Sequence, residues 1–319
     1  AWKGRAPGSV TWGLGHAVVA YNRRAVYEDG MARMYGATNI PEFRGIEGYE
    51  DHSVDMLFFW NKEKELIGIC INVACPSQVV EGRSAINADY WHPTRVALRE
   101  KFGEDVCILG LCGAAGDQAP RPMFRKEAEG RMTQLRGLDA LGELGRRISN
   151  TVIDTYEVVK DDRHTDVPLV HHVETIELPM RLVTDAEYNA SKAAVQQANE
   201  AIAKDPKNAD SAHRRMLWYD RVVKRYEAQK EEPNPTSPME LHVLRLGDAA
   251  ICTNPFELFT DYGIQIKGRS KAIQTLVIQL VGGGTYLPTD RAVQGGSYSA
   301  IIQSNTVGPK GGQVLVDKT

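Results

Sequence analysis

The sequence predicts an α/β fold with a crossover helix and an inserted pair of helices. Two apolar runs, Leu66 to Cys75 and Val106 to Cys112, have the length and flanking residues of buried strands. Between them, residues 88–102 place apolar and aromatic residues among charges and end at Gly103, a helix pattern with its stop signal. A strand, a helix and a strand in succession predict a parallel pair in an α/β sheet.

The inserted helices are the second observation. Asp185 to Lys204 and Asp210 to Glu231 both have helical patterns, and the polar, proline-containing segment 205–208 separates them. Three prolines within 232–238 end the second helix. We therefore expect a first part of the α/β core in 1–182, an inserted αα-hairpin in 183–238, and a second part of the core in 239–319.

The remaining elements follow from the same patterns. The first forty residues lack a helical period and indicate strands and loops, whereas leucines every three or four residues predict a helix over 126–159. Further strands are expected at Met56 to Trp60, Leu241 to Leu246, Ala249 to Thr253 and Thr275 to Val281.

Composition excludes several classes of protein. The 319 residues are 42% apolar and 25% charged, which is typical of a globular chain. The net charge of −3 offers no cationic surface for DNA or RNA, so we expect no nucleic-acid partner. No run of about 20 apolar residues is present, so no transmembrane segment is expected. Five cysteines, an odd number, do not suggest a disulfide framework.

The loop Gly113 to Pro120 is the first candidate for chemistry. Its small residues allow a ligand to approach the backbone, and Asp117 follows the carboxyl end of a predicted strand, where α/β sheets place their sites. A tight turn capped by Asp117 is the structural alternative.

Other strand ends carry polar residues as well. Asp89 stands at a predicted helix start, where a capping role is favoured over a ligand role. His52 precedes a strand, and a lone histidine there is more often hydrogen-bonded than bound to a metal. The segments 254–257 and 282–291 also follow strands, so several loops can converge on one pocket.

Five segments together carry a more specific pattern. They are Asn72 to Cys75, Ala88-Asp89, Gly113 to Pro120, Pro255 to Glu257 with Gly263 and Lys267 behind it, and Tyr286 to Arg291. In this order they resemble successive motifs of the neutral/alkaline non-lysosomal ceramidase family, over residues 10–315. The resemblance implies a zinc-dependent amidase with a mixed sheet core, in which a metal-bound water attacks an amide carbonyl. It also implies a secreted or periplasmic protein.

The departures from the family pattern concern the metal site. Pro76 and Gly283 stand where the family has a metal-binding His and Tyr, and Ala119 stands where it has a Ser; the acidic ligand is retained as Glu257. The family's histidine-rich N-terminal motif has no counterpart. The chain therefore resembles a C-terminal portion, whose partner would be the N-terminal portion of the same protein or another subunit.

These residues lead to our first hypothesis, a metal-dependent hydrolase of an amide or related bond in a small-molecule, lipid or glycan substrate other than ceramide. Zinc would be held by Glu257 with His52 or His92 as replacement ligands. The expected catalytic residues are Asp89, Asp117 and Glu257, and the expected substrate-binding residues are Gly116, Gln118, Cys75, Tyr286 and Arg291.

Two alternatives remain open. A thiolate of Cys75 or Cys112 beside a histidine could attack an acyl carbon, although buried structural cysteine is more common. A ligand-binding or structural protein without catalysis, possibly related to glycans, is the other.

Overall fold

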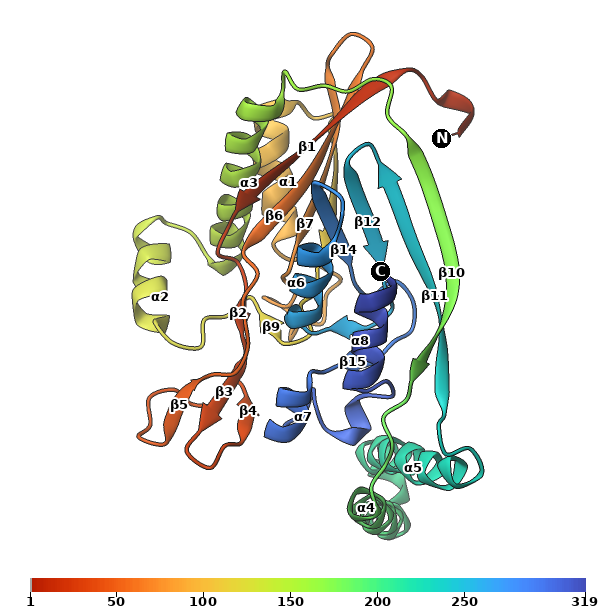
Figure 1. Cartoon of the computed structure of the whole chain (residues 1–319). Helices are drawn as coiled ribbons and strands as arrows, with labels where there is room; N and C mark the ends of the chain where they lie inside the picture. Colours follow the sequence, from red (N-terminus) through yellow and green to blue (C-terminus); the bar gives the residue numbers. More distant parts are fainter. Residues whose placement is uncertain (1) are drawn as a thin grey trace.

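Two four-stranded sheets lie face to face between two helical layers (Figure 1). The computed structural model describes residues 2–319 and confirms the α/β class. The first sheet has the order β1-β6-β7-β8, and the second has the order β10-β11-β12-β14. A mixed sheet core was expected; the stacking of two sheets is what the structure adds.

The first sheet contains the predicted crossover. Its strands are β1 (Gly8–His16), β6 (Ser53–Asn61), β7 (Leu66–Val73) and β8 (Cys107–Cys112). β7 and β8 are parallel and are joined by helix α1 (Trp91–Phe102), as the sequence predicts, whereas the other pairs are antiparallel. Helices α1 and α3 (Ala140–Val159) cover the outer face, where alternate residues of β6 join one large apolar cluster.

The second sheet combines a long hairpin with a parallel pair. Its strands are β10 (Leu169–Pro179), β11 (Thr236–Leu246), β12 (Ala249–Thr253) and β14 (Gln274–Ile278). β12 and β14 are parallel and are joined through helix α6 (Thr260–Arg269). Residues of this sheet form an apolar cluster with residues of α6 and of α8 (Pro309–Lys318), and Leu57, Cys70, Ala249 and Leu276 fill the space between the sheets.

The inserted hairpin separates β10 from β11. Helices α4 (Asp185–Lys204) and α5 (Asp210–Glu231) have the bounds that the sequence predicts, and a short turn, η2 (Pro206–Asn208), joins them. The Thr184 side chain and Glu187 form a capping box at the start of α4. The division of the chain into three segments remains a prediction.

The single helix expected over 126–159 is instead two helices, α2 (Lys126–Leu135) and α3. Gly137 adopts a φ of +68°, which ends the first helix, and the Asp139 side chain accepts from the Gly142 N–H at the start of the second. The leucine period therefore continues across a break that these two residues create.

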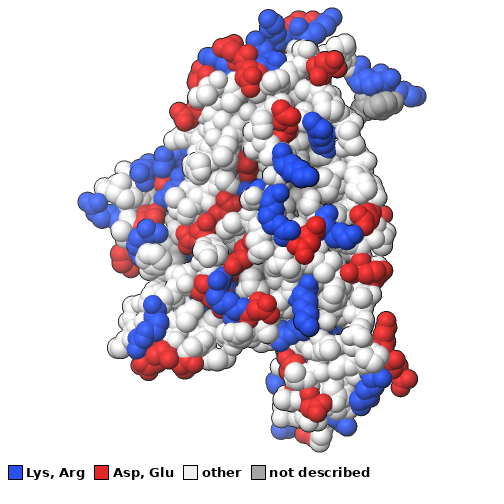
Figure 2. All heavy atoms as spheres, viewed as in Figure 1, with Lys and Arg blue, Asp and Glu red and all other residues white. Residues whose placement is uncertain are grey.

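Short elements complete the fold. β4-β3-β5 form a small sheet, and β2 with β9 and β13 with β15 form two-stranded pairs. No helix among residues 2–319 is long and apolar enough to cross a bilayer. Figure 2 shows acidic and basic side chains interspersed over one face of the molecule. The short elements are η1 (Trp2–Gly4), β2 (Tyr21–Asn22), β3 (Arg24–Tyr27), β4 (Ala32–Met34), β5 (Phe43–Ile46), β9 (Gln118–Ala119), β13 (Glu257–Leu258), β15 (Tyr286–Leu287), α7 (Asp290–Gly295) and η3 (Ile302–Ser304).

Candidate functional site

Loops from both sheets meet at one edge of the molecule. Gln279, the residue after β14, donates its backbone N–H to the carbonyl of Cys112 at the end of β8 (3.0 Å). Its buried side-chain oxygen accepts from the backbone N–H groups of Ala115 (3.1 Å) and Leu258 (2.9 Å). One amide side chain thus holds the loop after β8 against the segment after β12.

Glu257, Tyr286 and Arg23 form the polar centre of this edge. β13 and β15 run parallel with Glu257 opposite Tyr286, which brings the carboxylate close to the phenol. The Tyr286 hydroxyl also accepts from Nη2 of Arg23 at 3.1 Å. Burial, more than the Glu257 carboxylate, raises the pKa of Tyr286. The phenol therefore keeps its proton at neutral pH.

Arg23 is a buried cation without a carboxylate in contact. Its exposed fraction is 4%, and its other donors reach the carbonyl of Gly116 (2.9 Å) and the hydroxyl of Tyr35 (3.3 Å). Nε has no partner, and no ion pair of Arg23 is found among the described residues, 2–319. An unpaired buried donor on a charged group is costly, so the Arg23 guanidinium is not compensated by the protein as a structural cation normally is.

Arg23 was not expected in the site, because Asn22-Arg23-Arg24 reads as a charged turn. The sequence does contain a signal for burial of Arg23, because apolar residues flank the charged segment on both sides, at Val18 to Tyr21 and at Ala25-Val26. Charges between two such runs indicate buried strands rather than a surface turn.

Gly116 was expected to contact substrate, and it lies instead against the backbone of Glu257. A Cβ at Gly116 would come within 2.2 Å of the Glu257 carbonyl oxygen. The Gly116 N–H donates to the carbonyl of Leu258 at 2.8 Å. The glycine therefore allows the Asp117 loop and β13 to approach each other closely.

Asp117 is an anchor for this edge. It is 1% exposed, and its oxygens accept from the Asn22 amide (2.7 Å), the Thr260 N–H (2.9 Å) and the Thr260 hydroxyl (2.8 Å). Thr260 begins α6, where the helix dipole favours an anion. Its oxygens are already bonded to protein donors, so the structure favours the capping alternative over a catalytic role for Asp117.

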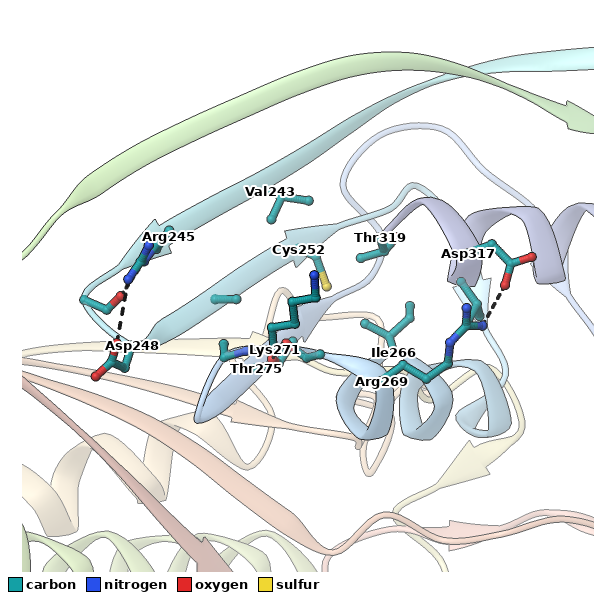
Figure 3. Close-up of a pocket in the computed structure, with 15 residues that line it drawn as sticks. Val243, Arg245, Asp248, Cys252, Ile266, Arg269, Lys271, Thr275, Asp317 and Thr319 are labelled. Carbon is teal, nitrogen blue, oxygen red and sulfur yellow. Dashed lines mark hydrogen bonds and ion pairs between the residues drawn. The ribbon is translucent and has the colours of Figure 1, made fainter.

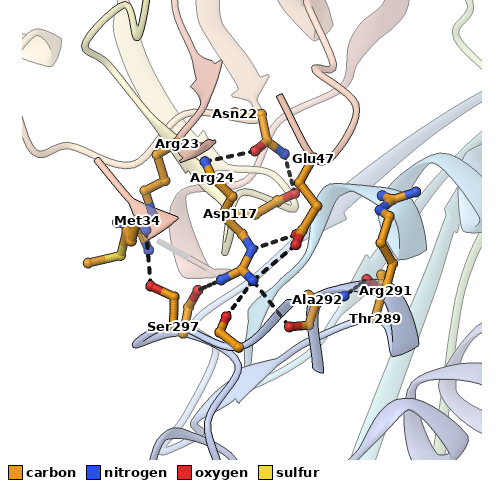
Figure 4. A network of polar contacts seen from close by, with 12 residues as sticks. Asn22, Arg23, Arg24, Met34, Glu47, Asp117, Thr289, Arg291, Ala292 and Ser297 are labelled. Atoms are coloured by element: carbon orange, nitrogen blue, oxygen red, sulfur yellow. Dashed lines mark hydrogen bonds and ion pairs between the residues drawn. The ribbon is translucent and has the colours of Figure 1, made fainter. Parts of the chain in front are cut away.

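Arg24, the neighbour of Arg23, is fully neutralised (Figure 4). Glu47 accepts from Nε (2.5 Å) and Nη2 (3.1 Å) of this arginine. The Ser299 hydroxyl and the carbonyls of Ala292 and Gly296 accept from the remaining guanidinium donors. The Arg24 guanidinium thus connects β3 to the segment around α7.

Asp89 braces a loop away from this centre. It adopts a φ of +53°, and its oxygens accept from the backbone N–H groups of Val80 (3.0 Å) and Tyr90 (2.8 Å). The Tyr90 hydroxyl donates to the Cys75 carbonyl at 2.7 Å. The geometry fits a local structural role for Asp89, which is 4% exposed.

The cysteines do not have the surroundings of nucleophiles. Cys75 is fully buried, and its expected contact with substrate stays a prediction. Burial raises the pKa of Cys112 to about 12 and the pKa of Cys75 well above its usual value. Both thiols are therefore protonated at neutral pH, and all five cysteines are free.

The described residues do not fit a zinc ion by themselves. His92 is exposed on α1, and His52 pairs with Glu50 at 3.2 Å. No group of three or more His, Cys, Asp or Glu side chains in residues 2–319 could hold a metal, although catalytic zinc normally has about three protein ligands.

Gln118 and Arg291 border the centre in different ways. Gln118 is fully buried and donates to the Tyr49 carbonyl at 3.0 Å, while its side-chain oxygen has no partner. Arg291 pairs with Asp261 at 2.9 Å and lies over the Tyr49 ring. Arg291 is the more accessible of the two.

Lys267 connects α6 to the segment around the start of β6. Its Nζ donates to Asp51 (2.8 Å), Ser53 (2.7 Å) and Asp55 (2.7 Å). Burial alone would lower the pKa of Lys267, but the two carboxylates outweigh it and raise that pKa. This motif residue has a structural role, because its donors bind α6 to the first sheet.

Two cavities lie at opposite ends of the strands. One, of about 590 Å³, adjoins Arg23 through Tyr35 and has Met123, Leu138 and Leu144 in its wall. The other, of about 470 Å³, lies near the amino ends of β12 and β14, where Arg245 pairs with Asp248 and Arg269 with Asp317 (Figure 3). The first is adjacent to the polar centre.

Comparison with solved structures identifies a related fold. A crystal structure of neutral ceramidase from Pseudomonas aeruginosa matches 98% of this chain with a TM-score of 0.60 and 14% identity. A structure described as ceramidase complexed with C2 matches the same share with a TM-score of 0.60 and 11% identity. Each match covers 52% of the other chain, so this chain spans about half their length. No protein-family profile and no curated protein matched the sequence.

This similarity confirms a ceramidase-like fold, the coarser part of the resemblance seen in the sequence. Identity of 11–14% supports the fold alone.

Proposed function

We propose that this chain carries part of the active site of a hydrolase that cleaves an amide bond in an N-acyl substrate. The observation that carries the proposal is the row formed by Glu257, Tyr286 and Arg23 at the carboxyl ends of the strands. A guanidinium without a counter-charge donates there to a protonated phenol, and a carboxylate lies opposite that phenol on the neighbouring strand.

The residues have complementary roles in amide hydrolysis. Arg23 and the Tyr286 hydroxyl bind the carbonyl oxygen and stabilise the negative charge that develops on it. Glu257 accepts a proton from the attacking water as its oxygen bonds to the carbonyl carbon, and then gives that proton to the amide nitrogen as the C–N bond breaks, so that an amine and a carboxylic acid are released. Asp117, Gly116 and Gln279 position these groups without contacting the substrate.

The acyl group would occupy the cavity beside Tyr35. Met123, Leu138 and Leu144 give that cavity apolar surface, charged side chains such as Lys126 and Glu129 also line it, and Tyr35 connects it to Arg23. By the resemblance, Pro76, Ala119 and Gly283 stand where the family has a His, a Ser and a Tyr, and these departures support a substrate other than ceramide.

Zinc remains part of the proposal only with ligands from outside this chain. The N-terminal portion of the same protein, or another subunit, would supply them next to Glu257. Metal analysis of the complete protein tests this point: near-stoichiometric zinc is expected, and an active metal-free preparation would refute it.

Glu257→Gln tests the proposed reaction. The amide keeps the size of the side chain, yet it cannot take up a proton. Turnover of N-acyl amino acids and N-acyl sugars should fall by about 10² to 10⁴, the range for loss of an acid–base group. Glu63→Gln, in an exposed turn, is the matched control.

Two results would contradict the proposal. One is a Glu257→Gln protein with normal turnover. The other is an intact protein that binds N-acyl compounds without cleaving any of them, which would indicate the ligand-binding alternative.

A further inference from the structure

A third pocket opens on the inserted hairpin, beside the polar centre. It has a volume of about 430 Å³ and is lined by Arg214, Arg215, Leu217, Trp218 and Arg221 of α5 together with Tyr298. Arg214, Trp218 and Arg221 recur at i, i+4 and i+7, so they share one face of the helix. Neither this pocket nor these residues were expected from the sequence.

The arginines of this pocket are not neutralised by the protein. None of the three forms an ion pair with a carboxylate in the part of the chain that the structure describes. Asp220, the acidic residue on the same stretch of helix, is paired with Lys224 at 2.7 Å. Guanidinium groups bind carboxylate, sulfate and phosphate through paired N–H donors.

Aromatic rings connect the pocket to the polar centre. The Tyr298 ring meets the edge of the Tyr286 ring at 5.7 Å and lies 6.2 Å from the Trp218 ring. Tyr298 is 48% exposed, so its ring is available to a ligand. A substrate bound at Tyr286 can therefore continue directly over Tyr298 toward the arginines.

The helix that carries the pocket is held firmly on the core. Arg225 of α5 donates to the carbonyls of Asn305 (2.8 Å) and Arg181 (2.9 Å), and Val222 packs with Ile302. Arg225 follows Arg221 by four residues and Val222 follows Trp218 by four, so these contacts hold the pocket side of α5 in place beside Tyr298. Such rigid support is what a binding site on an inserted arm requires.

We propose that this pocket is a subsite for an acidic sugar headgroup of the substrate. The proposal rests on the proposed function and specifies the part of the substrate on the far side of the amide bond. Trp218 and Tyr298 stack on the sugar ring, whose polarised C–H groups suit the negative face of an aromatic ring. Arg214, Arg215 and Arg221 bind its carboxylate, sulfate or phosphate group.

Direct binding tests the subsite independently of turnover. Calorimetry with a sulfated and a neutral disaccharide should show at least roughly tenfold tighter binding of the sulfated one, as expected for charge-assisted hydrogen bonds. Arg214→Gln/Arg221→Gln should remove that difference, whereas Lys204→Gln, on the same hairpin outside the pocket, should preserve it. Trp218→Ala should weaken both sugars.

Three outcomes would overturn the subsite: equal affinity for the two disaccharides, unchanged binding by the double variant, or binding of anionic phospholipid vesicles in preference to both sugars. Loss of turnover in Glu257→Gln with intact sugar binding would support both proposals. Normal turnover in Glu257→Gln with intact, arginine-dependent sugar binding would refute the reaction alone and leave the subsite standing.

Discussion

Arg23 and Arg24 are adjacent in the chain and both are buried, but their guanidinium groups have opposite electrostatic surroundings. Arg24 is bonded by Glu47 through two nitrogens and has acceptors for its other donors. Arg23 has two phenols and one carbonyl, and its Nε has no partner. A neutralised buried cation holds segments together, whereas one without a counter-charge is available to a ligand.

Lys267 extends the comparison, because two carboxylates and a hydroxyl satisfy its ammonium group. It belongs with Arg24 among the structural cations. Effects on the free energy of unfolding should therefore be large for the partners of Arg24 and Lys267, and small for Arg23.

The largest effect is expected for Arg24→Met. The substitution leaves Glu47 as a buried carboxylate without a partner, which should cost about 3–5 kcal/mol in the free energy of unfolding. Urea unfolding measures this loss. Arg33→Met, which removes an exposed pair with Asp29, should change stability by less than about 1 kcal/mol. Adding Glu47→Gln to Arg24→Met should restore part of the loss; no restoration would contradict the unpaired charge as its cause.

Asp51→Asn should have the next largest effect, about 1.5–3 kcal/mol, because it removes a charged hydrogen-bond partner of Lys267. Burial opposes ionisation of Asp51, but Lys267 outweighs it and lowers the pKa of Asp51. The stabilisation is therefore complete above the unfolded pKa of about 3.9 and is lost as pH falls through the lower folded value.

Unfolding measured at several pH values checks that sign. The difference between wild type and Asp51→Asn should be largest near neutral pH and should shrink below about pH 4. A difference that grows in acid would contradict this account of the Lys267 cluster. Asp29→Asn, in an exposed pair, is the control.

Gly116→Ala should cost about 1–3 kcal/mol, since the added methyl group collides with the Glu257 carbonyl. The same collision displaces β13, so turnover should fall more than stability alone explains. Gly130→Ala, in open space inside α2, should leave turnover unchanged and raise stability by about 0.5–1 kcal/mol, as alanine does in a helix interior. Normal turnover in Gly116→Ala would mean that this close approach does not position Glu257.

The smallest effect on stability is expected for Arg23→Gln, less than about 1 kcal/mol, because no buried carboxylate loses its partner. Turnover should nevertheless fall by roughly 10² to 10³, the range for loss of a group that stabilises an oxyanion. Thermal unfolding together with turnover measures both. An Arg23→Gln protein that unfolds as readily as Arg24→Met would remove the distinction between the two arginines.

The candidate site shows where sequence reasoning succeeds and where it stops. The order of the motifs predicts that Glu257, Tyr286 and the Asp117 loop lie at one edge of the molecule. The hydrogen bonds of Gln279 join the Asp117 loop to the Glu257 segment there. The order of the motifs does not distinguish residues that line the polar centre from residues that only support it structurally. Asp89 and Cys75 are buried among local partners, and His52 and His92 do not gather around Glu257.

The sequence by itself determined the crossover from β7 to β8 and the bounds of the inserted hairpin. These features depend on local signals, namely apolar periodicity, a capping box and proline or glycine stops, which act over a few residues. Only the tertiary structure decided that the strands divide into two stacked sheets, and that Glu47 neutralises Arg24 while Arg23 meets Tyr286. The Tyr286 hydroxyl comes from 263 positions along the chain, so no local pattern could assign it to Arg23. The partner of a buried charge is set by which distant segments pack together, and that packing decides whether the charge braces the fold or faces a ligand.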